Sequence, residues 1–457
     1  MYPTAVLNVV GLTKALLGPD TPNLNSLAAD GSMAPIRAIT PAVTCPAQAT
    51  FLTGLLPRDH GIVGNGWYFR DVAQVMLWKQ ANQLVNGEKV WETARRRDPK
   101  CTTAKMFWWF NMYSSAEWSV TPRPIYRADG LKVVDIYSQP AEIRDRLVAE
   151  HGAFPFFNFW GPQAGIRSSE WIAEASMAVD RWYSPTLLLV YLPHLDYNVQ
   201  RLGPKDPRIR EDVRAIDAVC GTLIAHCRER GRRVIVLSEY GLVPVTAPIH
   251  INRVLRKEGW LAVRDELGTD TLDAGASEAF AVADHQVAHV YVRNPARIPE
   301  VAARLRAEPG IDLVADRNGQ RELGLDHDRS GELVAISARD KWFTYYFWLD
   351  DAKAPDYART VDIHRKPGYD PVELFLDPKL ALPKVKVATT LAKKALGFRY
   401  LMEVIPLDAT LVKGSHGRIT DSPYDGPLVI SSERDAVRTD VIQSTAIRDL
   451  ILTHLFD

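Results

Sequence analysis

The sequence predicts an α/β protein built on a doubly wound, mostly parallel sheet with helices on both faces. Its strand candidates are short and almost wholly apolar, which is typical of strands buried on both faces. Helical patterns that end at glycine separate them, and polar clusters follow the strands directly. The chain has 457 residues, 46% of them hydrophobic, enough for a large core. Because ligands bind beyond the carboxyl ends of such strands, we expect the site there.

The first predicted elements are a strand, a helix and a second strand far along the chain. Residues 5–12 (AVLNVVGL) are a short β-branched run closed by glycine, which predicts a buried strand. Residues 21–31 (TPNLNSLAADG) predict a capped helix with a glycine stop. Residues 185–198 (PTLLLVYLPHLDYN) predict another buried strand, whose last residues form a polar cluster.

Predicted strands and helices continue to alternate along the chain. Residues 206–230 have helical periodicity, and residues 232–242 (RRVIVLSEYGL) predict a strand with a polar end. Residues 281–292 are a further strand candidate, and residues 295–310 predict a helix that stops at glycine. Alternating strands and helices predict crossover connections and therefore a parallel sheet.

We expect residues 1–457 to form a single domain with two insertions. Residues 67–180 are dense in aromatic side chains, for example FWWFNMY at 107–113. They predict either a cap over the site or a local aromatic core, and the sequence leaves both open. Residues 255–410 are expected to contain a second insertion. Within them, residues 386–404 are basic with one apolar face, which predicts a surface helix, with contact to a membrane surface as the alternative.

Charge and cysteine usage exclude several partners. Lys and Arg number 55, as do Asp and Glu, so the chain lacks the basic footprint of a protein that binds a nucleic-acid polymer. None of the four cysteines forms a Cys-x-x-Cys pair. No apolar run reaches membrane-spanning length, and the first residues lack a secretory signal pattern. We therefore expect a cytoplasmic protein without a membrane span, and nothing in the sequence indicates its oligomeric state.

Residues 44–65 read TCPAQATFLTGLLPRDHGIVGN and are the most informative stretch. Thr44 stands directly before a helical pattern, where a hydroxyl ordinarily caps the helix. The same position suits a nucleophile, because a helix N-terminus stabilises a nearby phosphoryl group. From these residues alone both interpretations remain open.

This stretch resembles the nucleophile region of the alkaline phosphatase superfamily. It is most similar to the type I phosphodiesterase branch, which includes nucleotide pyrophosphatases and phosphonoacetate hydrolases. The resemblance implies that Thr44 is the covalent phosphoryl acceptor and that Asn65 donates to a nonbridging phosphate oxygen. A sulfatase does not fit, because proline follows Cys45 directly. The matching positions are Thr44, Pro46, Thr53-Gly54, Leu56-Pro57, His60-Gly61-Ile62 and Asn65.

The same resemblance implies a centre of zinc-like ions. Asp196, in LPHLDYNVQRLGP, corresponds to one usual ligand. Glu239, in VIVLSEYG, stands where the family has aspartate, and His416, in KGSHGR, corresponds to a distant histidine. These three side chains are the metal ligands that the resemblance implies most directly.

Three other usual ligand positions hold different residues, namely Val10, Gln200 and Tyr240. Glutamine coordinates through its carbonyl oxygen and suits harder ions than zinc. We therefore expect one or two divalent ions, Zn, Mn or Mg, with Gln200 as a weaker ligand. Asp362 and His364, in DIHRKPGYDPVELF, are candidate substitutes. Further side chains are candidate ligands or, more ordinarily, structural residues: Asn8, His194, Asp284, His285, His289 and Asp370.

Two functions compete. The first is a metal-dependent hydrolase of a small phosphorus ester, such as a phosphodiester, a nucleotide pyrophosphate or a phosphonate, through a phospho-threonine at Thr44. The Arg365-Lys366 pair is a candidate for binding an anionic group of that substrate. The second is a non-catalytic binding or scaffolding protein with a degenerate metal centre. A serine hydrolase is excluded by the lack of a Gly-x-Ser-x-Gly motif.

Overall fold

A mostly parallel sheet forms the centre of the molecule, as predicted. The computed structural model describes residues 1–129 and 131–457. Within them the central sheet has nine strands, of which β11, β1, β10, β5 and β6 run parallel to one another. In spatial order the strands are β23 (Ile442–Gln443), β2 (Ser32–Arg37), β22 (Leu428–Ser431), β11 (Arg233–Leu237), β1 (Thr4–Val9), β10 (Leu187–Leu192), β5 (Thr103–Met106), β6 (Trp118–Pro122) and β9 (Ile136–Gln139).

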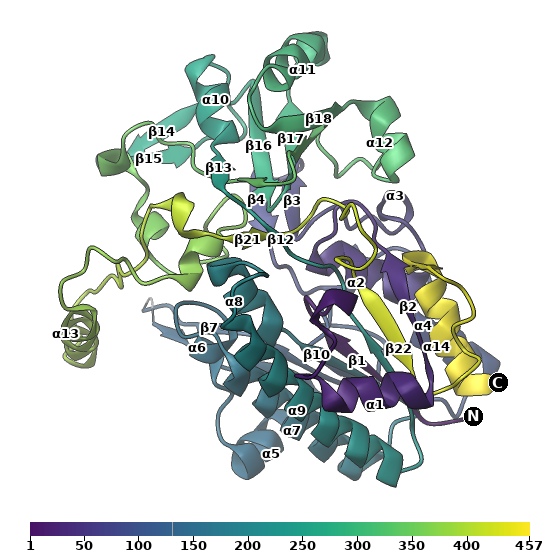
Figure 1. Ribbon diagram of the computed structural model, residues 1–457. Coiled ribbons are helices and arrows are strands. Elements are labelled where there is room, and N and C mark those ends of the chain that lie inside the picture. The colour runs from purple at the N-terminus through teal and green to yellow at the C-terminus, as the bar shows by residue number, and fades with distance from the viewer. Residues whose placement is uncertain (130) are drawn as a thin grey trace.

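Helices cover both faces of this sheet (Figure 1). One face carries α1 (Pro22–Asp30), α7 (Ile166–Tyr183) and α9 (Ile209–Glu229), and α9 contacts both α1 and α7. The other carries α2 (Thr44–Thr53), α4 (Val90–Arg97) and α14 (Ile447–Phe456). Every residue of β1 and β10 is buried. Burial on both faces explains why these strands are continuously apolar rather than alternating.

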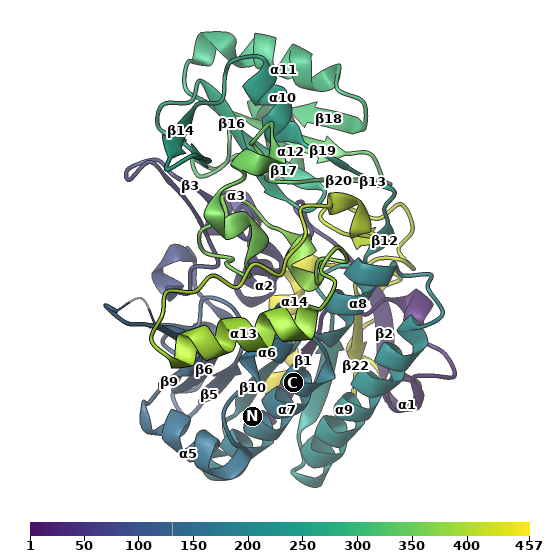
Figure 2. The same ribbon diagram turned by 90° about the vertical axis from the view of Figure 1, so that its left-hand side faces the viewer.

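A second sheet lies beyond the carboxyl ends of the central strands (Figure 2). It is antiparallel, in the order β16 (Ala279–Asp284), β17 (Val287–Val292), β19 (Leu333–Ser337) and β18 (Ile311–Ala315). The prediction of one strand over 281–292 was therefore wrong. The chain turns back at His285, whose φ of 60° lies in the left-handed region. No glycine or asparagine marks that turn, so the two strands were predicted as one continuous apolar strand.

The polar end of the predicted strand 185–198 is helical. β10 stops at Leu192, and α8 (His194–Leu202) begins after Pro193. Proline cannot donate to the sheet ladder but is accepted at a helix start. As a result Asp196 and Gln200 stand four residues apart on one helix face. The helices predicted over 21–31, 206–230 and 295–310 are present as α1, α9 and α11 (Ile298–Arg306).

The remaining elements are short and connect or extend the two sheets. No helix in the described residues combines the length and apolarity needed to cross a membrane. These elements are α3 (Pro57–His60), β3 (Gly66–Phe69), β4 (Gln74–Leu77), β7 (Ile125–Tyr126), β8 (Lys132–Val133), α5 (Glu142–His151), α6 (Phe156–Phe159), β12 (Val243–Pro244), β13 (Ala247–Ile249), α10 (Ile251–Lys257), β14 (Val263–Glu266), β15 (Thr269–Leu272), α12 (Arg317–Leu323), β20 (Lys341–Phe343), α13 (Pro383–Ala395) and β21 (Gly414–Ser415).

The aromatic region 67–180 divides between the two alternatives that the sequence left open. Phe107 and Trp171 pack against Phe154 in the core, with ring centroids 4.9 and 5.2 Å from it. Trp78 and Trp160 instead line a large cavity. Part of the region is thus core and part is wall of the site. The division into one domain with two insertions stays a prediction.

Candidate active site

Thr44 is the first residue of α2 and lies one position further into the helix than predicted, because Val43 holds the cap position. Its hydroxyl makes no capping bond; instead Oγ1 lies 3.3 Å from the hydroxyl oxygen of Tyr240. The helix is ten residues long and ends at Gly54 in the left-handed region. Only 4% of Thr44 is exposed, yet the side chain lines the large cavity. A hydroxyl at a helix N-terminus and facing a cavity is placed to attack a bound anion.

Asn65 lies beside the start of α2, where the resemblance implies it. Its Oδ1 accepts from the backbone N–H of Cys45 at 3.0 Å. Its Nδ2 donates to Oδ1 of Asp284 at 3.0 Å, and its backbone N–H donates to Oδ2 of the same carboxylate at 2.8 Å. Burial raises the pKa of Asp284 to about 6. Asp284, a candidate ligand by sequence, thus orients Asn65, and this contact uses one of the two amide hydrogens of Asn65.

Asp196 lies on the other side of Thr44. Its Oδ1 accepts from the Tyr240 hydroxyl at 3.3 Å, and its Oδ2 accepts from Nε2 of Gln200 at 2.8 Å. Burial raises the pKa of Asp196 to about 7, against the opposing effect of these two donors. Burial likewise keeps the pKa of Tyr240 well above its ordinary value, so its hydroxyl stays protonated. Tyr240 therefore links Thr44 to a carboxyl that titrates near neutrality.

The ring of Tyr240 occupies the space next to His416. The two rings are stacked, with centroids 3.5 Å apart and planes at 6°. Nδ1 of His416 is 2.8 Å from the carbonyl oxygen of Ala42, and Nε2 faces Oδ1 of Asp196 at 3.7 Å. Burial lowers the pKa of His416 to about 3, so it is neutral. It donates from Nδ1 and presents the bare Nε2 to Asp196.

Glu239 is held at the end of β11 by two amides. Asn8, on the neighbouring strand β1, and Gln48, on α2, each donate to Oε1 at 2.6 Å. Burial raises the pKa of Glu239 to about 8, with the Asp196 charge adding to the rise. Sequence reasoning missed Gln48. Its spacing of four residues from Thr44 on the same helix was the available signal.

The remaining candidate ligands have other partners, although His285 also lines the cavity and packs on His416 with ring centroids 3.6 Å apart. Asp362 and His364 line the mouth of the cavity, and Asp362 pairs with Arg365 at 3.4 Å. His194 faces Asp212 at 3.1 Å. The other candidates have structural partners: His285 stacks on Tyr369, His289 contacts the carbonyl of Val63, and Asp370 pairs with Lys366.

The donor set does not fit the pair of zinc-like ions that the resemblance implies. In the ranges 1–129 and 131–457, no three His, Cys, Asp or Glu side chains come close enough to hold an ion together. Asp196 and His416 remain as neighbours, but Gln200 turns its amide nitrogen toward Asp196 and Val10 has no donor. Zinc sites ordinarily use three or four protein ligands. Dependence on Zn, Mn or Mg stays a prediction of the sequence, and a reaction carried by the chain's own residues alone is the alternative that chelation tests.

The cavity next to Thr44 has a volume of about 900 Å³. Asp196 and Tyr240 share its inner wall with Thr44, and Trp78 and Trp160 contribute apolar wall. Such a volume suits a ligand of drug size or larger. The cavity therefore accepts far more than an isolated phosphate group.

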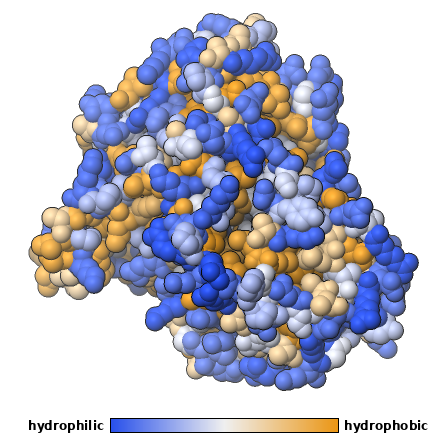
Figure 3. Space-filling model, viewed as in Figure 1, coloured by the Kyte–Doolittle hydropathy of each residue, from blue (hydrophilic) through white to orange (hydrophobic). Residues whose placement is uncertain are grey.

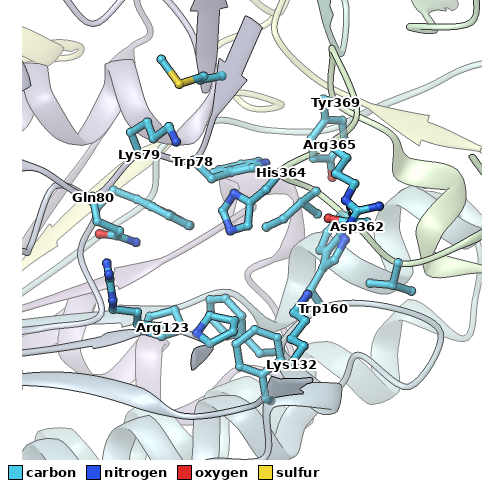
Figure 4. A pocket seen from close by; sticks show the side chains of 18 of the residues that line it. Trp78, Lys79, Gln80, Arg123, Lys132, Trp160, Asp362, His364, Arg365 and Tyr369 are labelled. Carbon is cyan, nitrogen blue, oxygen red and sulfur yellow. Dashed lines mark ion pairs between the residues drawn. The ribbon is translucent and has the colours of Figure 1, made fainter. Parts of the chain in front are cut away.

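Basic side chains surround the mouth of this cavity (Figure 4). Lys79 and Arg123 lie on one side and Arg365 on the other. Lys79, Arg123 and Lys132 form no ion pair with any described residue. The predicted Arg365-Lys366 pair is divided: Arg365 lines the cavity, whereas Lys366 is buried in ion pairs of 2.7 Å with Asp370 and Glu373. Asp356 and Asp362 also line the cavity, and Asp362 pairs with Arg365, but the cations without an ion pair leave the mouth with an excess of positive charge, which attracts anions.

Comparison with known proteins identifies the class. The family model of type I phosphodiesterase / nucleotide pyrophosphatase matches residues 4–370, so the chain belongs to this family. It is 27% identical over 237 residues to an uncharacterized pyrophosphatase/phosphodiesterase of Schizosaccharomyces pombe, covering 50% of this chain and 41% of that protein. It is 29% identical over 240 residues to human ectonucleotide pyrophosphatase/phosphodiesterase family member 7, covering 50% and 44%. The matches thus span less than half of these relatives.

Solved structures share the fold along the whole chain. Phosphonoacetate hydrolase from Sinorhizobium meliloti, in complex with phosphonoacetate, superposes with a TM-score of 0.63 at 15% identity, covering 99% of this chain and 96% of that one. Murine ectonucleotide pyrophosphatase/phosphodiesterase 5, as an inactive variant in complex with AMP, gives a TM-score of 0.60 at 15% identity, covering 100% and 95%. The predicted alkaline phosphatase-like architecture is confirmed.

Proposed function

We propose that this protein is a phosphodiesterase-type hydrolase that cleaves a small phosphorus ester with Thr44 as its nucleophile. The observation that carries the proposal is the chain of contacts from Thr44 through Tyr240 to Asp196, each 3.3 Å long, on the wall of an electropositive cavity. Membership of the family and the shared fold support the reaction class. Phosphodiesters, nucleotide pyrophosphates and phosphonates are the proposed substrates.

The proposed reaction has two steps. Oγ1 of Thr44 attacks phosphorus while its proton passes to the Tyr240 oxygen, and the Tyr240 proton passes to Asp196. The bond from phosphorus to the leaving atom breaks; this atom is an oxygen in an ester or pyrophosphate and a carbon in a phosphonate. A phospho-threonine forms, and the leaving group takes a proton from solvent. Water then attacks phosphorus and releases a proton to solvent, the bond to Oγ1 breaks, and Thr44 recovers its proton from Asp196 through Tyr240. Contacts of 3.3 Å are long, but such bonds often tighten only when substrate binds.

Negative charge on the phosphoryl oxygens has two sources of stabilisation in this site. The first is the N-terminus of α2, whose dipole favours an anion at Thr44. The second is the remaining amide hydrogen of Asn65, which Asp284 holds in place. No step in this account uses a metal ion, because the donor set does not fit a pair of them.

The test compares Thr44→Val with Thr44→Ser in turnover of bis-p-nitrophenyl phosphate and p-nitrophenyl phosphate. Valine keeps the shape but lacks the oxygen, so we expect a loss of at least about 10³-fold. Serine keeps the nucleophile and should retain most of the activity. Equal activity of wild type and Thr44→Val would refute the mechanism. Binding of phosphorus esters without turnover in the wild type would favour the non-catalytic alternative.

A further inference from the structure

The segment from Lys379 to Met402 combines positive charge with exposed apolar side chains; we call it the basic arm. It contains α13 and has no Asp or Glu. In a chain with equal numbers of acidic and basic residues, this is a strong local bias. Its cations are Lys379, Lys384, Lys386, Lys393, Lys394 and Arg399.

Helix α13 turns an apolar face away from the protein. Its inner face consists of partly or fully buried side chains, among them Val387 and Thr390. Val385 on the outer face is 52% exposed, and Leu382 and Leu396, which stand directly before and after the helix, are 67% and 73% exposed. A surface helix ordinarily presents the opposite arrangement, with its apolar stripe toward the core.

The figures place this face at the edge of the molecule. Figure 1 shows α13 projecting from the body of the protein, and Figure 3 shows a cluster of hydrophobic surface on the same side. The apolar surface continues past the helix, because Phe398 and Leu401 are 64% and 45% exposed. An exposed apolar surface of this extent, rimmed by lysines, indicates an interaction site.

The basic arm also reaches the candidate active site. Tyr400, Leu401 and Met402 line the same cavity as Thr44. Because the chain runs directly from α13 into this wall, whatever binds the arm lies near the mouth of the cavity. The arm therefore connects an interaction surface to the site.

We propose that the basic arm docks the protein on an anionic lipid bilayer. An interfacial helix inserts an apolar face at the boundary of headgroups and acyl chains, while lysines beside it contact the headgroups. The arm carries only positive charges, which are complementary to anionic lipid. Its affinity for neutral lipid should therefore be lower. Attachment is peripheral, and it does not depend on the proposed hydrolase activity.

The test is flotation of the full-length protein with vesicles of phosphatidylcholine alone or mixed with phosphatidylserine. We expect binding to the mixed vesicles to be at least about tenfold tighter, and to weaken as salt is raised. No binding to either vesicle, or equal binding to both, would overturn the proposal.

Matched variants identify the surface. Leu382→Gln/Val385→Gln/Leu396→Gln should weaken binding to the mixed vesicles at least about tenfold, and Lys384→Gln/Lys393→Gln about fivefold per charge removed. Leu267→Gln/Leu313→Gln is the control, because these leucines are also exposed but lie in β18 and the turn after β14. Full binding by the first variant, or an equal loss in the control, would overturn the proposal. Binding to an acidic protein, without binding to vesicles of either composition, would also overturn the proposal.

Discussion

The two halves of the candidate active site follow the family pattern to different degrees. On the α2 half, Thr44 and Asn65 lie together as the resemblance implies. On the strand-end half, Val10, Gln200 and Tyr240 stand in ligand positions, and Tyr240 occupies space between Thr44 and Asp196. The comparison teaches that a nucleophile on a helix N-terminus has its own electrostatic support, whatever lies opposite it.

The strongest way to sharpen this comparison is to remove the hydroxyl that joins the halves. Tyr240→Phe keeps the ring stacked on His416 but breaks both contacts of the hydroxyl. We expect kcat to fall about 10²- to 10³-fold, since positioned proton transfer contributes on this scale. Steady-state kinetics with bis-p-nitrophenyl phosphate measure it, with the melting temperature as the control for folding. If Tyr240→Phe has the same kcat as the wild type, the proton of Thr44 leaves by another path.

A second change converts one half toward the family pattern. In Gln200→His/Tyr240→His, two imidazoles join Asp196 and His416, so a set of three or four zinc ligands becomes available. We expect zinc affinity to rise at least about 100-fold over wild type, since zinc sites ordinarily use four ligands and the wild type offers two. Isothermal titration calorimetry measures the change, and Gln200→Leu/Tyr240→Phe is the matched control. Tight zinc binding by the wild type would show that the present donor set suffices.

The pH profile tests the role of Asp196 as proton acceptor. Its pKa is raised to about 7 by burial, and the acceptor must be ionised. Activity should therefore rise about tenfold per pH unit below 7 and level off above it. In Tyr240→Phe this limb should disappear. A profile that is flat between pH 5 and about 8 would exclude Asp196 from the proton path.

A smaller effect is expected on stability. The pKa of Glu239 is raised from 4.5 to about 8, so the folded protein binds this proton more tightly than the unfolded chain does. The free energy of unfolding should then decline as pH rises from about 4.5 to about 8. Glu239→Gln removes the titration and should be more stable than wild type at pH 9 by on the order of 1 kcal/mol. Urea unfolding at pH 5 and 9 measures the free energy of unfolding of both proteins. The same difference between wild type and Glu239→Gln at both pH values would refute the raised pKa of Glu239.

The smallest predicted effect concerns the mouth of the cavity. Arg123→Gln removes one unpaired cation and should raise KM about three- to fivefold with kcat little changed, because the charge attracts substrate without contacting the reacting atoms. Arg127→Gln is the matched control, since Arg127 already faces Asp129. A fall in kcat instead would place Arg123 at the phosphorus atom.

The sequence predicted the central sheet and the helix that begins at Thr44 because both follow from local patterns, whereas the role of Thr44 as nucleophile stays a prediction from the family resemblance. Continuous apolar runs indicate doubly buried strands, and the motif around Thr44 specifies a helix start. It did not predict the contacts of Tyr240 with Thr44 and Asp196, which join three distant segments. Nor did it predict the hairpin at His285, where tertiary packing sustains a turn without the usual turn residues.

The most direct test of the account is to acid-quench the wild type with bis-p-nitrophenyl phosphate in excess chelator and to search for a phosphorylated peptide by mass spectrometry. The account predicts modification at Thr44, absent from Thr44→Val, because the proton path from Thr44 runs through Tyr240 to Asp196. An adduct that forms only after zinc, manganese or magnesium is restored would contradict the metal-free path. An adduct on another residue would contradict the choice of nucleophile.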